Sequence, residues 1–120
     1  MPLILVADDD SQLRGWLRSV LEEKGYQVEE AVDGSEALTF LKRAEPALIV
    51  LDLFMPNMDG SEVLLYLRSR DRPIKVLAIS GHIIDDFDLS QTAIVLGAHA
   101  AMGKPFSAKD FLQRVESLLG

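Results

Sequence analysis

The chain contains no cysteine. This absence excludes a disulfide framework and any metal site built from thiolates. A chain without cysteine is compatible with the reducing cytosol, and we expect the protein to be cytoplasmic.

Long hydrophobic runs are also missing. The apolar segments at residues 3–7 and 47–51 are far shorter than the roughly 20 residues of a membrane-spanning helix. Met1 and Pro2 lead directly into the first of these segments, without the pattern of a signal peptide. The sequence therefore predicts a soluble protein that does not interact with membranes.

Basic residues are scarce relative to acidic ones. The chain has 12 Lys and Arg against 19 Asp and Glu, which gives a net charge of −7. Such a balance disfavours a nucleic-acid backbone as the main partner, so we expect no direct nucleic-acid binding by this domain. With 120 residues, 48% of them hydrophobic, the chain is the size of one domain, residues 1–120. A second catalytic or DNA-binding domain does not fit.

Short apolar runs alternate with helical patterns along the whole chain. The runs predict strands at residues 3–7, 26–31, 47–51, 74–79 and 98–102. Helical stripes predict helices that end near Lys24, before Pro46, before Pro73 and at Gly97, and a last helix capped by Ser107. The breakers in residues 54–60, with Asp33 and Gly34 earlier in the chain, indicate a loop and a turn.

This alternation predicts a doubly wound α/β domain of the flavodoxin-like class. Parallel strands need crossover connections, which place helices on both faces of the sheet. We expect a five-stranded parallel sheet of order 2-1-3-4-5, flanked by five helices. In such sheets, ligands bind beyond the carboxyl ends of the strands, where the order reverses between strands one and three.

Five polar residues lie at the carboxyl ends of predicted strands: Asp8, Asp9, Asp52, Ser80 and Lys104. The predicted strand order brings all of them to one edge. Two carboxylates about 4 Å apart repel by roughly 4 kcal/mol at an effective dielectric near 20, so a cluster of them implies a cation. Oxygen ligands select Mg²⁺, Ca²⁺ or Mn²⁺, and few carboxylates with room for water and phosphate favour Mg²⁺.

The same residues suggest phosphoryl transfer. An aspartate can accept a phosphoryl group as an acyl phosphate, and Asp52 is the best placed for this step. Lys104 supplies a positive charge, and Ser80 a hydroxyl that can donate to a phosphate oxygen. Taken singly, Asp8 could be a helix cap, Asp52 and Ser80 turn residues, and Lys104 a surface charge. Four such places on one edge make the joint interpretation stronger.

Four segments resemble the signature segments of receiver domains of two-component response regulators. They are Leu-Val-Ala-Asp-Asp-Asp at residues 5–10, Leu-Asp-Leu-Phe-Met-Pro-Asn-Met-Asp-Gly at 51–60, Ile-Ser-Gly at 79–81 and Gly-Lys-Pro-Phe at 103–106. They occur in the order of that family and at about its spacings. The resemblance covers the full chain.

The resemblance implies a role for each site residue. Asp52 would take a phosphoryl group from a phosphohistidine on a sensor histidine kinase or a histidine phosphotransfer protein. Asp9 and Asp52, with the backbone carbonyl of Phe54, would hold Mg²⁺, and Asp8 would act through ordered water.

The remaining residues would form the switch. Ser80 would move onto the phosphoryl group, Lys104 would pair with it, and the Lys104-Pro105 bond is cis in many relatives. The chain would then be a phosphorylation-dependent signalling switch for a downstream protein target. It would not be a metabolic enzyme, and only its own phosphotransfer and dephosphorylation would be self-catalysed.

Two features depart from the family pattern. Ala101 stands three residues before Lys104, where an aromatic residue is usual, so readout through that ring is absent. The stretch from Ser80 to Lys104 is about two residues longer than usual, and we expect a mobile acidic segment at residues 85–88 and an altered partner face. Partners are expected at the fourth helix, fifth strand and fifth helix.

One further hypothesis concerns water. His82 and Phe54 each lie two residues beyond a site residue and could limit the access of water to the acyl phosphate.

Two alternatives stay open at the level of the sequence. Asp8 and Asp10 resemble the aspartate pair of haloacid-dehalogenase-type phosphohydrolases, although Gln12 stands where Thr or Val is expected and no cap insertion is present. The other alternative is a degenerate receiver that acts as a constitutive binding module. The intact Asp9 and Asp52 argue against it.

Overall fold

The computed structural model describes residues 2–53, 60–70, 73–80 and 97–120. Its five strands form one parallel sheet of order β2-β1-β3-β4-β5, which confirms the predicted topology. The strands are β1 (Leu3–Ala7), β2 (Gln27–Ala31), β3 (Leu48–Asp52), β4 (Lys75–Ser80) and β5 (Ala100–Gly103). The helices of the described residues are α1 (Ser11–Glu23), α2 (Gly34–Arg43), α3 (Gly60–Arg68) and α5 (Ala108–Leu119).

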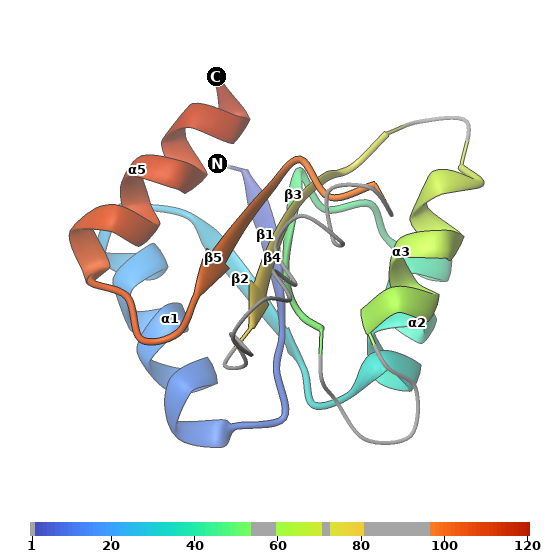
Figure 1. The fold of residues 1–120 in the computed structure, drawn as a ribbon, viewed down its shortest axis with the longest axis horizontal. Coiled ribbons are helices and arrows are strands. Elements are labelled where there is room, and N and C mark those ends of the chain that lie inside the picture. The colour runs from blue at the N-terminus through green and yellow to red at the C-terminus, as the bar shows by residue number, and fades with distance from the viewer. Residues whose placement is uncertain (1, 54–59, 71–72, 81–96) are drawn as a thin grey trace, which may run out of the picture.

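The helices cover both faces of the sheet. Figure 1 shows α1 and α5 on one side and α2 and α3 on the other. The described residues therefore contain four of the five predicted helices. The predicted helix that ends at Gly97 would fall within residues 81–96, outside the described residues, and so does the acidic segment at residues 85–88.

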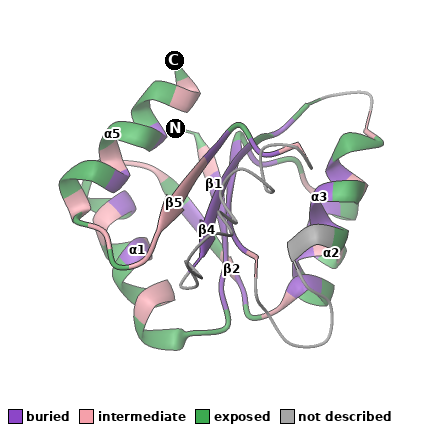
Figure 2. Ribbon diagram, viewed as in Figure 1, coloured by how far each residue is buried: buried purple, intermediate pink, exposed green. Residues whose placement is uncertain are grey.

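The continuous apolar run of β1 is explained by burial on both faces of the sheet (Figure 2). Ile4 and Val6 face the α1 and α5 side, whereas Leu5 and Ala7 face the α2 and α3 side. All four are fully buried. Two hydrophobic clusters, one on each face, hold the sheet in place. No described helix combines the length and the apolar character needed to cross a membrane.

Helix starts follow the capping residues of the sequence. Asp10 caps α1, and Ser107 caps α5 as predicted, its hydroxyl accepting from the Asp110 N–H at 3.1 Å. The prediction of a turn at Asp33 and Gly34 was wrong. Asp33 is the N-cap of α2, and its side chain accepts from the backbone N–H of Glu36, a reciprocal arrangement in which Glu36 accepts from the preceding backbone.

The last strand begins two residues later than predicted. Residue 99 lies before β5, and its backbone N–H donates to the carbonyl of Val76 at 2.9 Å.

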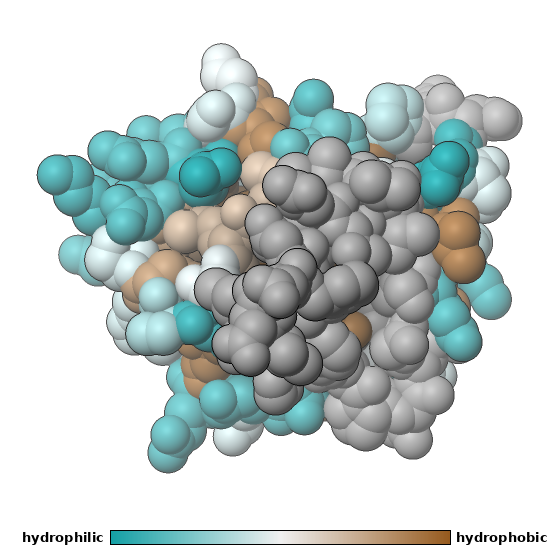
Figure 3. All heavy atoms as spheres, viewed as in Figure 1, coloured by the Kyte–Doolittle hydropathy of each residue, from teal (hydrophilic) through white to brown (hydrophobic). Residues whose placement is uncertain are grey.

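In the space-filling view, hydrophilic side chains cover the outer part of α5, and less polar ones lie beside β5 (Figure 3).

Candidate functional site

Backbone pairing brings four chain segments together at the carboxyl edge of the sheet. Asp52 is the last residue of β3 and pairs in register with Ile79 of β4. Ser80 ends β4, and its carbonyl accepts a 2.7 Å hydrogen bond from the backbone N–H of Lys104. Asp8 directly follows β1, the other neighbour of β3. The backbone pairing of the strands thus fixes the Cα positions from which these side chains extend.

Three carboxylates cluster at this edge. Asp8, Asp9 and Asp52 each offer an oxygen that lies within 4.8 Å of the other two. Asp8 is fully buried and Asp52 is 3% exposed, whereas Asp9 is exposed. Buried carboxylates this close repel one another unless a cation lies among them. The donors are all oxygen, which fits a hard divalent cation, and the exposed Asp9 leaves a side open to solvent.

Lys104 is the cation that the chain itself supplies. Its Nζ lies 3.1 Å from Oδ2 of Asp8 and 3.2 Å from Oδ2 of Asp52. Burial by itself would lower the pKa of the Lys104 ammonium, but the two carboxylates outweigh burial and raise this pKa. Lys104 therefore stays charged between two nearly inaccessible carboxylates. Oδ2 of Asp8 is paired with this ammonium, yet it accepts no well-directed hydrogen bond from any described residue.

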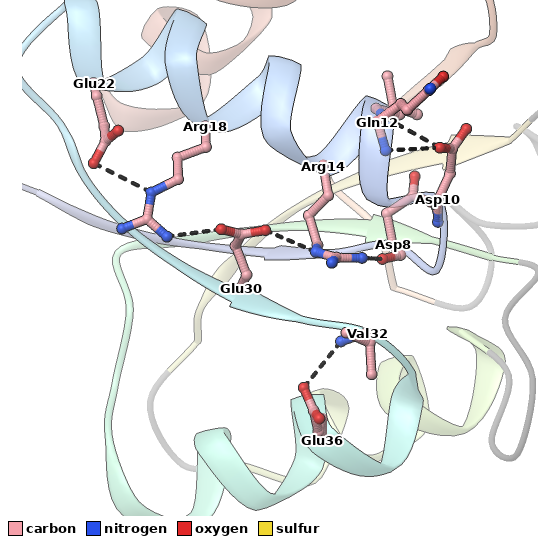
Figure 4. A network of polar contacts seen from close by, with 10 residues as sticks. Asp8, Asp10, Gln12, Arg14, Arg18, Glu22, Glu30, Val32 and Glu36 are labelled. Carbon is pink, nitrogen blue, oxygen red and sulfur yellow. Dashed lines mark hydrogen bonds and ion pairs between the residues drawn. The ribbon is translucent and has the colours of Figure 1, made fainter.

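Two further oxygens of Asp8 accept hydrogen bonds from the start of α1 and its N-cap, and the Asp8 N–H donates to the carbonyl of Ala31 in β2 at 3.1 Å. Its Oδ1 accepts from the backbone N–H of Asp10 at 2.8 Å, and its backbone carbonyl accepts from Nη1 of Arg14 at 2.8 Å. Figure 4 shows that Arg14 also extends to Glu30 of β2, with Nε 2.7 Å from Oε1. No local pattern in the sequence marks Arg14 as a site residue, because only the pairing of β1 with β2 brings Glu30 beside α1.

The structure brings Asp8, Asp9, Asp52 and Lys104 together, and it places Ser80 at the same edge, 6% exposed. The expected cis bond between Lys104 and Pro105 is present. The backbone carbonyl predicted as a metal ligand, at Phe54, and the side chain of His82 lie outside the described residues.

Ala101 occupies the middle of β5. It pairs in register with Ala78 and packs, half-buried, against the α2 and α3 side of the core. The small side chain of Ala101 therefore lies beside the equally small side chain of its sheet neighbour.

A shallow hollow adjoins the site. It is lined by residues of α1 and of the segment after β5, namely Asp10, Leu13, Trp16, Lys104, Pro105 and Phe106. The rings of Trp16 and Phe106 lie 6.1 Å apart, and Trp16 is 37% exposed. An apolar surface thus lies beside the buried charges.

The response regulator receiver domain model matches residues 4–116. The chain belongs to this family. Receiver domains are signalling domains of two-component systems, and their general role is to accept a phosphoryl group. The receiver assignment removes the haloacid-dehalogenase alternative, since the match covers nearly the whole chain.

Curated relatives of this receiver are longer proteins. The chain is 42% identical over 117 residues to a probable transcriptional regulator, ycf27, of Cyanophora paradoxa, covering 97% of this chain and 47% of the relative. It is 38% identical over 120 residues to the response regulator MprA of Mycobacterium sp. strain KMS, covering 99% of this chain and 51% of that protein. The chain thus spans about half the length of these relatives.

Solved receivers share the fold. The receiver domain of the Francisella response regulator 1452 superimposes with a TM-score of 0.90 at 31% identity, covering 99% of this chain and 97% of that chain. A CheY-like receiver from Methanospirillum hungatei JF-1 gives a TM-score of 0.91 at 27% identity, covering 99% and 94%.

Proposed function

We propose that Asp52 is the phosphoacceptor of this receiver. The supporting observation is the ion pair between Lys104 and Asp52, 3.2 Å long, inside the group of three carboxylates. Asp52 ends a central strand and is almost inaccessible, whereas Asp9 is exposed and Asp8 already accepts a hydrogen bond from the backbone N–H of Asp10. Asp52 is therefore a buried carboxylate at a strand end, beside a cation that can stabilise a transferred phosphoryl group.

The reaction is a transfer between partners. A carboxylate oxygen of Asp52 attacks the phosphorus of a phosphohistidine, and a new P–O bond forms while the P–N bond breaks. The electron pair of the broken bond stays on the imidazole nitrogen, which takes up a proton. The product is an acyl phosphate, whose phosphoryl oxygens accept from the Lys104 ammonium and from the Ser80 hydroxyl.

Mg²⁺ fits the carboxylate group as the resident cation. Asp9 and Asp52 would bind it directly and Asp8 through water, with the carbonyl of Phe54 as a further ligand from outside the described residues. When bound, Mg²⁺ supplies positive charge for the phosphoryl oxygens. In the absence of the ion, Lys104 offsets part of the negative charge of the two buried carboxylates.

The donor is a sensor histidine kinase or a histidine phosphotransfer protein. The hollow lined by Trp16, Pro105 and Phe106 offers an apolar surface beside the acceptor for such a partner. Two relatives are a probable transcriptional regulator and a response regulator of about twice this length. We therefore propose that residues 1–120 are one receiver unit in the cytoplasm that controls a downstream protein and does not itself bind nucleic acid.

The experiment is incubation with Mg²⁺ and a small acyl phosphate, read by intact mass. We expect one phosphoryl adduct on the wild type and none on Asp52→Asn. Asp9→Asn should still fold but gain the adduct far more slowly, because one metal ligand is lost. An adduct on Asp52→Asn would overturn the assignment of the acceptor.

The same experiment tests the degenerate-receiver alternative. A wild-type chain that gains no phosphoryl group with Mg²⁺ present, from either the small donor or a phosphorylated histidine kinase, would be a constitutive binding module. The thermal stability of each variant should be measured in parallel, so that loss of the adduct is not confused with loss of the fold.

A further inference from the structure

We infer that Arg14 is a positioning residue for the carboxylate group. It holds the backbone carbonyl of Asp8, from which Asp9 follows directly, and it is itself fixed by Glu30 of the neighbouring strand. This inference rests on the proposed function only in taking Asp8 and Asp9 as residues of a Mg²⁺ site.

The geometry of Arg14 is that of a bridge. Nη1 donates to the Asp8 carbonyl at 2.8 Å, and Nε donates to Glu30 at 2.7 Å. The Arg14 side chain is 14% exposed, so water competes little for these contacts. A guanidinium presents its donors in a rigid planar fork, which holds two acceptors in a fixed geometry, whereas the ammonium of a lysine is a point charge on a flexible stem.

Glu30 is anchored on its other oxygen. Oε2 of Glu30 lies 2.7 Å from Nη1 of Arg18, and this hydrogen bond lowers the pKa of Glu30. Glu30 therefore stays ionised near neutral pH and keeps Arg14 in place. Arg18 also pairs with Glu22, 3.3 Å away, which completes the network drawn in Figure 4.

The backbone carbonyl of Asp8 lies where β1 has just ended, immediately before Asp9. Beyond it, the backbone leaves β1 and turns into α1, and the Asp10 N–H donates to Oδ1 of Asp8. Arg14 and the Asp10 N–H thus hold the same residue from two directions. Outer contacts of this kind orient metal ligands, and losing one commonly weakens metal binding by about 10–100-fold.

Arg14 and Arg18 form a matched pair of variants. Both residues lie on α1 and both lie 2.7 Å from Glu30, but of the two only Arg14 contacts Asp8 in the described structure. Arg14→Met removes the bridge and the charge. Arg14→Lys keeps the charge but loses the planar fork of donors, and Arg18→Met removes a similar ion pair that does not contact Asp8.

The measurement is a titration of each variant with MgCl₂, followed by amide chemical shifts. We expect the Mg²⁺ affinity to fall about tenfold in Arg14→Met and by a smaller factor in Arg14→Lys. It should fall by less in Arg18→Met than in Arg14→Met, because Arg18 reaches Asp8 only through Glu30 and Arg14. A pure charge effect has the opposite sign, because removing a cation near carboxylates should tighten Mg²⁺ binding.

Three outcomes would overturn the inference. They are an unchanged affinity in both Arg14 variants, a tighter affinity in Arg14→Met with Arg14→Lys like the wild type, and an equal loss in Arg18→Met. The last outcome would mean that any loosening of α1 disturbs the site.

A second measurement needs no metal and separates this inference from the proposed function. Hydrogen exchange of the Asp10 amide, which donates to Asp8, should become about tenfold faster in Arg14→Met than in Arg18→Met. If the wild type binds no Mg²⁺, the proposed function fails while exchange still decides the role of Arg14. Equal exchange rates in the two variants would then remove that role.

Discussion

The two ends of the sheet differ in how many carboxylates each cation contacts. At the carboxyl end, one ammonium, that of Lys104, lies between two carboxylates that are almost inaccessible, with Asp9 beside them. At the amino end, Arg70 faces one carboxylate, that of Glu45, at 3.7 Å. The first arrangement has an excess of negative charge, and the second is balanced one to one.

The amino end also uses local backbone contacts. The ring of His99 accepts from the backbone N–H of Val76 at 3.0 Å, and its own backbone N–H donates to the Val76 carbonyl. Arg70 donates to the carbonyl of Leu41 at 3.2 Å. These contacts connect the neighbouring strands and helices at the amino end through backbone groups, without bringing like charges together. The carboxyl end of the sheet, where carboxylates outnumber cations, is therefore the end suited to bind a metal cation and a phosphoryl group.

Removing the Lys104 ammonium should have the largest effect on stability of the changes considered for either end of the sheet. Lys104→Met leaves Asp8 and Asp52 without this partner, and we expect a loss of about 2–3 kcal/mol of unfolding free energy without Mg²⁺. MgCl₂ should restore a large part of it, because the ion replaces the lost charge. Urea unfolding with and without MgCl₂ measures both effects.

The control for that variant is a lysine with no such role. Lys109 is exposed on α5, and Lys109→Met should change stability by less than about 0.5 kcal/mol with or without Mg²⁺. Equal stabilities of the two variants in the absence of the ion would show that the carboxyl end is not strained by its charge.

Much of the site could be predicted from the sequence, because strand ends are predictable. The buried run before Asp8 and the run before Asp52 mark two strands, and the strand order makes them neighbours. Arg14 could not be predicted in the same way. Its partner Glu30 lies 16 residues away, and their contact depends on how α1 crosses the sheet beside β2.

The misassigned turn has a similar cause. Asp followed by Gly is typical of turns, but Asp33 has a Glu three residues later. Asp33 accepts from the Glu36 N–H and Glu36 accepts from the Val32 N–H, and these two bonds favour a helix start. The two-residue Asp-Gly pattern is compatible with both a turn and a helix start, and the four-residue Asp-x-x-Glu pattern decides for the helix start.

The second prediction perturbs the backbone at the amino end. Gly97 has φ +120°, and a Cβ there would lie 2.8 Å from Cγ of Arg68. We expect Gly97→Ala to cost about 1–2 kcal/mol, mostly from the backbone, since the exposed Arg68 side chain can move. The Mg²⁺ affinity should not change, because the site is at the other end of the sheet.

Gly15 gives a control of opposite sign. It lies within α1, and a Cβ at this position would meet no atom of the described structure within 4 Å. Gly15→Ala should therefore stabilise the protein by about 0.5–1 kcal/mol. Thermal unfolding of the two alanine variants compares them directly. A Gly97→Ala variant as stable as the wild type would contradict the assigned backbone cost.

The smallest expected effect concerns the pH dependence at the amino end. Burial, and then the charge of Lys75, lower the pKa of His99 from its usual value near 6.5. The neutral ring is also the form whose Nδ1 can accept from Val76. The folded pKa is below the unfolded one, so this contribution is complete above pH 6.5 and is lost as pH falls through the folded pKa.

His99→Asn sharpens this test, because the Asn Oδ1 can accept the same hydrogen bond but does not titrate. Between about pH 7.5 and pH 5, the wild type should lose about 1 kcal/mol more stability than His99→Asn, the net value of one hydrogen bond. Urea unfolding at several pH values measures the difference. Because His99 lies at the opposite end of the sheet from Lys104, the same variant should leave the response of stability to MgCl₂ unchanged. Parallel pH profiles for the two proteins would mean that the ring of His99 does not sense pH, and that the amino end is held by its backbone contacts alone.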